Sequence, residues 1–146
     1  MREEIGDLWQ RHATGYWVAI TTNGIVRRDG ACVMGRGVAR EAANRLGGVA
    51  REIGTALTAR GNHVIVLHHH RLLTFPVKEH WRDRADLSLI QRSARELVEA
   101  VVLDRTIRSP VYLVRPGCGN GGQRWEDVRP LIAPFLDDRF IVIERG

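Results

Sequence analysis

The stretch Pro110-Val111-Tyr112-Leu113-Val114-Arg115-Pro116-Gly117-Cys118-Gly119-Asn120-Gly121-Gly122 indicates the fold of this chain. Its first five residues are mostly β-branched and aromatic, which is typical of a strand. A glycine run follows, and residues Glu126 to Leu136 have the pattern of a helix, with Pro134 favouring an early end. A strand, a glycine loop and a helix in succession are typical of α/β domains, which bind ligands at the carboxyl ends of their strands.

The same alternation extends through the rest of the chain. We predict further strands at Tyr16–Thr22, His63–Leu67, Arg71–Phe75 and Phe140–Ile143, and helices at Val38–Arg45, Val49–Ala59 and Asp86–Asp104. Pro76 is expected to end the pairing of its strand, because proline has no N–H to donate. This order predicts a layered α/β domain with a largely parallel sheet.

Length and composition favour one globular domain over residues 1–146. Of the 146 residues, 44% are hydrophobic and 27% are charged, which suffices for a core without metal or disulfide support. No apolar run approaches the roughly 20 residues of a membrane span, and the charged start predicts no signal peptide. Two cysteines, Cys32 and Cys118, give too few ligands for a metal, and we expect a reduced, cytoplasmic protein without a cofactor.

The charge of the chain is basic and unusually distributed. A formal net charge of +5 favours an anionic partner, such as a nucleotide or a nucleic acid, although it is also compatible with plain solubility. Of the 22 basic residues, Lys78 alone is a lysine. Arginine stays protonated, whereas a lysine amine can lose its proton and act as a nucleophile, so Lys78 is a candidate catalytic residue.

Two glycine clusters, at positions 24–37 and 117–122, follow predicted strands and precede predicted helices. Backbone N–H groups at such places form cradles for anions, so we predict a phosphate-bearing ligand. The alternative is two ordinary turns. The second cluster also fits G-x-G-x-x-G, but only 24 residues follow Gly122, too few for a dinucleotide-binding unit.

Four motifs, in this order and spacing, resemble those of macro domains. They are Gly6-Asp7-Leu8, Met34-Gly35-Arg36-Gly37-Val38-Ala39, Phe75-Pro76-Val77-Lys78-Glu79-His80-Trp81-Arg82, and the glycine run with Trp125. The resemblance is greatest to the branch of the DarG antitoxins and the terminal ADP-ribose protein glycohydrolases. It implies a three-layer α/β/α fold with a central mixed sheet and an ADP-ribose cleft.

The resemblance also implies roles for individual residues. Asp7 would accept a hydrogen bond from the adenine amino group, although by its position alone it is a helix cap or a turn residue. Asn23 would lie near the distal ribose. The full implied ADP-ribose-binding set is Asp7, Leu8, Asn23, Met34, Gly35, Arg36, Gly37, Val38, Gly117, Cys118, Gly119, Asn120, Gly121 and Gly122.

Lys78 falls on the lysine that this branch uses in catalysis, and nearby cations, with His80, Arg82 and Arg84 as candidates, would depress its pKa. We expect Trp81, together with His80 and Arg82, to contact the substrate. The implied function is hydrolytic removal of ADP-ribose from a modified target, foremost a thymidine base in DNA, in an ADP-ribosyltransferase toxin system. The alternatives are a non-catalytic ADP-ribose reader and a protein-directed ADP-ribosyl hydrolase.

Four departures from the branch affect this interpretation, one of which is Arg36, at a position where the DNA-directed branch commonly has lysine. Gly121 stands where the terminal glycohydrolases carry a catalytic aspartate, which favours the DNA-directed branch and leaves the proton donor unnamed. The basic stretch Asn23 to Gly30 is either a loop that grips substrate or an insertion particular to this chain. Many DarG chains continue into a second region, which we expect this chain to lack.

Other residues have simpler interpretations. Adjacent side chains at His68, His69 and His70 point in different directions, so we predict an exposed turn and no metal site. Trp17 and Trp125 are predicted in the core. Cys118 is predicted to be a small packing residue, because the sequence places no histidine to activate it.

Overall fold

The computed structural model describes residues 1–145, and its centre is a six-stranded sheet. The strands are β1 (Arg2–Ile5), β2 (Val18–Asn23), β3 (Val66–Leu67), β4 (Leu72–Lys78), β5 (Val111–Val114) and β6 (Phe140–Glu144). Their order in the sheet is β1-β6-β5-β2-β4-β3, and every pair is parallel except β3 with β4. The sheet is therefore mixed, as the resemblance implied.

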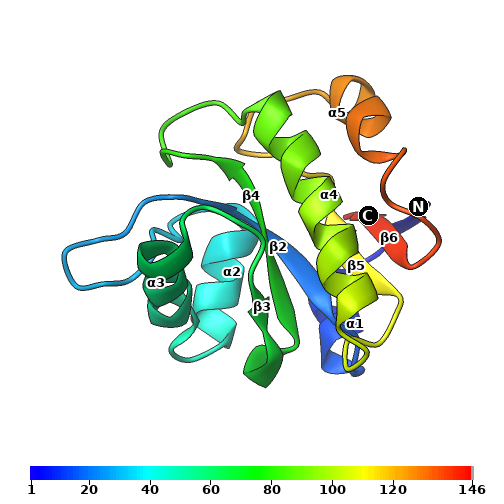
Figure 1. Cartoon of the computed structure of the whole chain (residues 1–146). Helices are drawn as coiled ribbons and strands as arrows, with labels where there is room; N and C mark the ends of the chain where they lie inside the picture. Colours follow the sequence, from blue (N-terminus) through cyan, green and yellow to red (C-terminus); the bar gives the residue numbers. More distant parts are fainter. Residues whose placement is uncertain (146) are drawn as a thin grey trace.

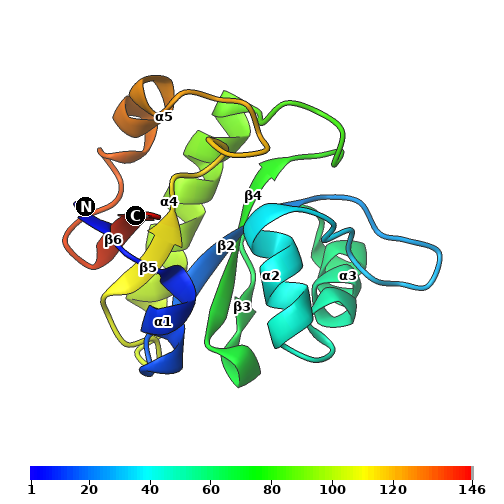
Figure 2. The same ribbon diagram turned by 180° about the vertical axis from the view of Figure 1, so that it is seen from behind.

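Five α-helices cover the two faces of this sheet. They are α1 (Leu8–Ala13), α2 (Gly37–Arg45), α3 (Val49–Arg60), α4 (Leu87–Leu103) and α5 (Trp125–Ile132). In Figure 1 α4 crosses the near face of the sheet with α5 beside it, and Figure 2 shows α1 and α2 on the opposite face. The result is the three-layer α/β/α architecture.

Alternation along the buried strands explains why both faces are covered. On β2, Ala19 packs into the core beneath α4 and α5, whereas Val18 and Ile20 pack beneath α1, α2 and α3. All three side chains are at most 1% exposed. A strand that is apolar on both faces needs a layer on each side, so the hydrophobic run predicts a three-layer fold.

Several predicted boundaries need correction. Strand β4 runs through Pro76 to Lys78, so the expectation that Pro76 ends the pairing was wrong. Strand β3 pairs only with Leu72 and Leu73, so β4 has no strand beyond it at Pro76, and the missing N–H breaks no ladder there. Helix α5 ends at Ile132, before Pro134, and the short helix α1 was not predicted.

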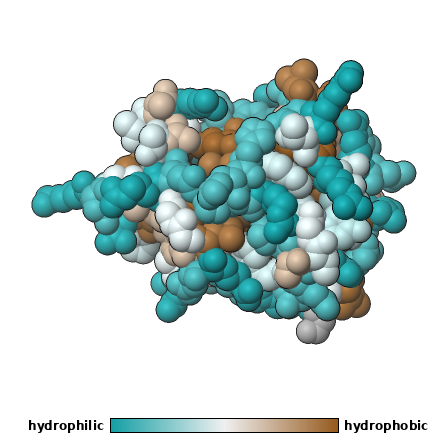
Figure 3. Space-filling view, turned by 90° about the horizontal axis from the view of Figure 1, so that it is seen from below, coloured by the Kyte–Doolittle hydropathy of each residue, from teal (hydrophilic) through white to brown (hydrophobic). Residues whose placement is uncertain are grey.

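The surface carries few exposed large hydrophobic side chains. Figure 3 views the molecule from below and shows a mostly hydrophilic face with small, separate hydrophobic areas. Within residues 1–145, the large exposed hydrophobic residues are Ile5, Trp81, Val102 and Leu103. No helix in that range is both long and apolar enough to cross a membrane.

Candidate ligand-binding cleft

A cleft of about 860 Å³ lies at the carboxyl ends of the parallel strands. Its volume falls within the usual range for small-molecule sites, about 300–1,000 Å³. Most of the predicted site residues line it, drawn from β2, β4 and the two glycine loops. They are Asn23, Gly35, Arg36, Gly37, Val38, Lys78, Trp81, Gly117, Cys118, Gly119, Asn120 and Gly121.

The other predicted residues lie beside the cleft or beneath it. Leu8 and Met34 are buried in the core on the side of α1 and α2. His80 and Arg82 flank Trp81, with the Arg82 guanidinium 5.1 Å from the centre of its ring. Asp7 caps α1 by accepting a hydrogen bond from the backbone N–H of Trp9 at 2.9 Å. Gly122, at a φ of +74°, follows the last lining glycine.

The two glycine loops meet over the middle of the cleft. A Cβ atom added to Gly37, at a φ of +58°, would lie 3.0 Å from Asn120 Nδ2. Gly37 begins α2, and Arg36, which precedes it, makes no side-chain cap. The first N–H groups of α2 are therefore available to an anion at this point.

The second glycine loop is hydrogen-bonded to Ala85, two residues before α4. Gly121 accepts a hydrogen bond from the N–H of Ala85 at 2.8 Å, and Gln123 Nε2 donates to the Ala85 oxygen at 2.6 Å. A Cβ atom at Gly121 would lie 2.6 Å from the Gly117 oxygen and 2.8 Å from Ala85 Cβ. Position 121 thus has no room for a side chain in this packing, which agrees with the glycine found there.

The cleft has two chemically different ends. Lys78, Val77 and Trp81 come from the end of β4 and the loop after it, whereas Glu41, Ile143 and Arg145 come from α2 and the end of β6. Strands β4 and β6 are separated by β2 and β5 in the sheet. At about 4.8 Å per strand, the two ends are roughly 14 Å apart.

Lys78 occupies one end with its amine held in place. Its Nζ donates to the backbone oxygen of Asp83 at 3.2 Å. Burial lowers the pKa of Lys78, and the positive charge of Arg36 lowers it further, against the opposing charge of Asp83. The influential cation thus comes from the first glycine loop, and not from His80, Arg82 or Arg84 as the sequence suggested. Lowering the pKa favours the neutral, nucleophilic amine.

Asn23 is buried, with 7% of its surface exposed, and its amide supports the neighbouring loop. Nδ2 donates to the Val33 oxygen at 2.9 Å, and Oδ1 accepts from the Ile25 N–H at 3.0 Å. One amide hydrogen and one lone pair remain for a ligand.

Sequence reasoning missed the residues at the opposite end. Glu41 accepts hydrogen bonds from Trp9 Nε1 at 3.0 Å and from Arg145 at 2.6 Å, and the Arg145 bond lowers the pKa of this carboxyl. Glu41 lies one helical turn after Gly37, so its spacing could have placed it beside the phosphate loop.

Trp125 was predicted in the core; it is half-buried, packs against the core and also lines the cleft. Its Nε1 donates to Glu3 Oε1 at 3.0 Å, and the Arg115 guanidinium lies 5.1 Å from its ring centre. Edge strand β1 therefore helps to fix one wall of the cleft.

The remaining candidates lie where packing explains them. The histidines at 68–70 form a 3-10 turn, in which His68 pairs with Asp104 and His70 with Glu52. Within residues 1–145, no three potential ligand side chains are grouped to hold a metal. Burial raises the pKa of the Cys118 thiol to about 11, which disfavours the nucleophilic thiolate.

No family model matches the sequence, and no curated protein matches it either. Solved structures do match, and they show that the chain has the macrodomain fold. The macrodomain of Mycobacterium tuberculosis DarG superposes with a TM-score of 0.78 at 22% identity, over 99% of this chain and 97% of that one. The macrodomain of Thermus aquaticus DarG gives a TM-score of 0.73 at 23% identity, over 99% and 97% of the two chains.

A third match is Thermosipho africanus DarTG, solved in complex with ADP-ribose. It gives a TM-score of 0.75 at 20% identity and covers 98% of this chain, but 41% of that longer one. At these identities the likeness concerns the fold.

Proposed function

We propose that the cleft binds ADP-ribose and that the chain is a hydrolase, which removes ADP-ribose from a modified target. The observation that carries the proposal is the placement of Lys78, whose amine lies at one end of a cleft lined along its middle by two glycine loops. The foremost target is a thymidine base in DNA. The partner is then an ADP-ribosyltransferase toxin, whose product this chain would reverse.

The ligand would lie along the cleft with its diphosphate between the glycine loops. The N-terminus of α2 and Arg36 supply donors and positive charge for it. The distal ribose would reach Lys78 and Asn23, and the adenine would lie at the other end, near Glu41 and Arg145. Asp7 is close enough to Arg145 for the two charges to interact, which supports its assignment to the adenine end.

The chemistry would begin with the neutral amine of Lys78. Attack on the anomeric carbon forms a bond from Nζ to that carbon as the glycosidic bond breaks. The electron pair of the broken bond goes to the leaving group, which takes up a proton. Water then releases ADP-ribose and restores the amine. The lowered pKa of Lys78 increases the fraction of amine that can react.

The mouth of the cleft supports a nucleic-acid target. Trp81 is 41% exposed, with Arg82 over its ring, an arrangement on which an unpaired base can stack. The chain carries a net charge of +5, which favours a polyanion. We also propose a cytoplasmic protein, because both thiols are free.

A non-catalytic reader of ADP-ribose is the second candidate. The observation that favours it concerns the proton donor that a hydrolase needs. The carboxylates that line the cleft, Glu41 and Glu144, lie at the end remote from Lys78, and position 121 admits no side chain. A reader would bind ADP-ribose and release nothing.

Two substrates would separate these functions. The protein and its Lys78→Ala variant would each be incubated with an oligonucleotide carrying ADP-ribosyl-thymidine and with an ADP-ribosyl-glutamate peptide. Mass spectrometry would then measure the loss of ADP-ribose from each substrate. Loss of ADP-ribose from DNA, abolished in the variant, is expected. Release from the peptide alone would move the assignment to protein-directed hydrolysis, and ADP-ribose binding with no release would establish a reader.

A further inference from the structure

The end of strand β4 departs from regular geometry immediately before Lys78. On β2, Thr22 pairs with Pro76 and the next residue, Asn23, pairs with Lys78. Val77 is therefore an extra residue on β4, which makes a β-bulge. Both Val77 and Lys78 line the cleft. Lys78 therefore follows the bulge directly and lies at the edge of the cleft.

A β-bulge weakens the hydrogen-bond ladder between two strands, and this bulge is stabilised by hydrogen-bond donors from other parts of the chain. Four consecutive carbonyl oxygens around Lys78 each accept a hydrogen bond. Ser93 Oγ donates to Pro76 at 2.6 Å, the Asp86 N–H to Val77 at 2.7 Å, and the Gly24 N–H to Glu79 at 2.9 Å. The oxygen of Lys78 itself accepts from Asn62 Nδ2 at 3.2 Å.

Asn62 makes a second contact with the same segment. Its Nδ2 also donates to Glu79 Oε2 at 3.1 Å, so both amide hydrogens are used on residues 78 and 79. Within residues 1–145, Oδ1 of Asn62 is buried without a hydrogen-bond partner. A flipped amide would place this oxygen against two acceptors, so only one orientation is compatible with the site.

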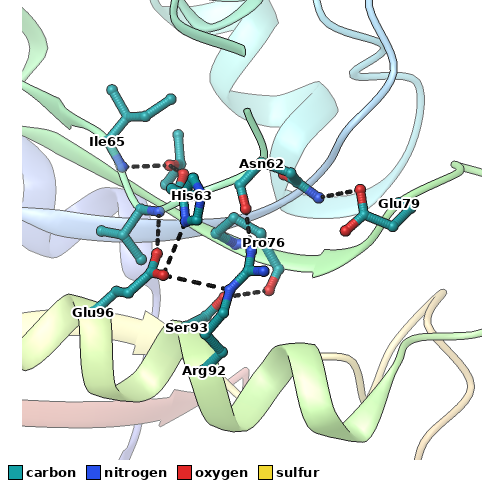
Figure 4. Close-up of polar contacts among 10 residues, drawn as sticks. Asn62, His63, Ile65, Pro76, Glu79, Arg92, Ser93 and Glu96 are labelled. Atoms are coloured by element: carbon teal, nitrogen blue, oxygen red, sulfur yellow. Dashed lines mark hydrogen bonds and ion pairs between the residues drawn. The ribbon is translucent and has the colours of Figure 1, made fainter. Parts of the chain in front are cut away.

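The loop that carries Asn62 is fixed from the other side by α4 (Figure 4). Arg92 Nη2 donates to the backbone oxygen of Asn62. Glu96, one turn further along, accepts from the Val64 N–H at 3.0 Å and pairs with His63 Nδ1 at 2.9 Å. Asn62 thus connects a rigid helix to the backbone of Lys78.

We propose that Asn62 is a positioning residue for Lys78: its amide holds the bulged end of β4 and thereby keeps the Lys78 amine at the end of the cleft. The role rests on the proposed function, in which Lys78 reacts. Asn62 is not among the residues that line the cleft, so it acts through Lys78 and not on the ligand.

The test compares Asn62→Ala and Asn62→Asp with His63→Ala. The last variant removes a contact from the same loop that does not involve β4. We expect Asn62→Ala to lower kcat on the ADP-ribosylated oligonucleotide about tenfold, since small displacements of a reacting group cost up to ~10²-fold. Its Kd for ADP-ribose should stay within about twofold, a change of less than ~0.5 kcal/mol. Asn62→Asp, with a carboxylate facing the Glu79 carboxylate, should lose at least as much.

A second readout does not depend on turnover. Because Lys78 is the only lysine, reductive methylation with ¹³C-formaldehyde labels it and the N-terminal amine alone, and Lys78→Arg assigns the two NMR signals. The charges facing the amine are Arg36 and Asp83, which these variants leave in place. Loosening of Lys78 into solvent should therefore raise its pKa toward the ordinary lysine value in Asn62→Ala, and not in His63→Ala.

These readouts separate the two proposals. An unchanged Lys78 pKa in Asn62→Ala, or an equal change in His63→Ala, would overturn the positioning role. If the parent protein releases no ADP-ribose, the hydrolase proposal fails while the NMR titration still decides the role of Asn62.

Discussion

The amine of Lys78 donates a hydrogen bond over 3.2 Å to the backbone oxygen of Asp83, five residues further along the chain. The contact ties the candidate nucleophile to the loop that carries Trp81. Because the acceptor is neutral backbone, the amine can keep this position in either protonation state.

Replacing Lys78 with arginine should abolish turnover while retaining ligand binding. Arginine keeps the positive charge but does not lose its proton at accessible pH, so it cannot attack as a free amine. We expect Lys78→Arg and Lys78→Ala to lower kcat at least ~10²-fold, a loss typical of removing a group that takes part in proton or bond transfer. Calorimetry should give ADP-ribose affinities near that of the parent. Full activity in Lys78→Arg would exclude the nucleophilic role.

The pH profile should report the environment of Lys78. If the neutral amine reacts, kcat rises with pH as the amine loses its proton, and the rise lies below the ordinary lysine value of 10.5 because burial and Arg36 lower its pKa. Arg36→Gln removes one of these causes, so the pKa should increase and the rising limb should move to higher pH. Arg84→Gln is the matched control, because that cation does not act on Lys78 in the structure. Equal displacement in both variants would contradict the assignment.

Gly121 and Gly119 provide a matched pair within one loop. Gly121→Ala introduces a Cβ atom 2.6 Å from the Gly117 oxygen, whereas a Cβ atom at Gly119 meets nothing within 4 Å. Overpacking of this kind costs about 1–3 kcal/mol, so Gly121→Ala should lower both the thermal midpoint and the affinity for ADP-ribose. The free energy of unfolding of Gly119→Ala should stay within ~0.5 kcal/mol of that of the parent protein. Similar melting curves for the two variants would show that the loop readily moves.

These sites also show which features of the structure could be predicted from the sequence. The glycine run and the single lysine predicted the two loops and the candidate nucleophile, because glycine clusters and reactive side chains are visible as residue types. The bulge at Val77 was not predictable, since it depends on how β4 pairs with a strand some fifty residues earlier. Asn62 was missed for the same reason, because its contacts with Lys78 and Glu79 are long-range.

Two sequence-based interpretations were wrong because the outcome depends on tertiary packing. Pro76 stays in its strand because β3 is too short to run beside it. The cation that acts on Lys78 is Arg36, which is distant in sequence, and not a neighbour in the same motif. Glu41 and Arg145, at the opposite end of the cleft, are brought together by α2 and β6 and have no motif of their own.

The role of Asp7 at the adenine end can be separated from its role as a helix cap. If its carboxylate accepts from the adenine amino group, the protein should prefer ADP-ribose to inosine diphosphate ribose, in which an oxygen replaces that amino group. Asp7→Ala should reduce this preference about tenfold, since a hydrogen bond to a charged group contributes roughly 1.5–3 kcal/mol. Asp86→Ala removes the equivalent cap of α4 and should leave the preference unchanged. A preference retained in Asp7→Ala would assign adenine recognition elsewhere.

Salt should weaken activity on DNA more than activity on a peptide. A basic groove that holds single-stranded phosphates releases counterions, and about three such contacts would reduce kcat/KM roughly 10–20-fold between 50 and 200 mM salt. Arg82, which stacks on the exposed Trp81, is placed to make one of these contacts. Arg82→Gln should therefore reduce the steepness of the salt dependence.

Arg28 is the matched control, because it lies on the basic loop that the sequence left open as a substrate grip or an insertion. That loop is fixed on α3, where Arg51 donates to the Asp29 oxygen at 2.8 Å, and Arg28 is not among the residues lining the cleft. Arg28→Gln should keep the salt dependence of the parent protein. A reduction as large as that in Arg82→Gln would instead show that the loop grips the substrate, and a flat profile in the parent would argue against a DNA target altogether.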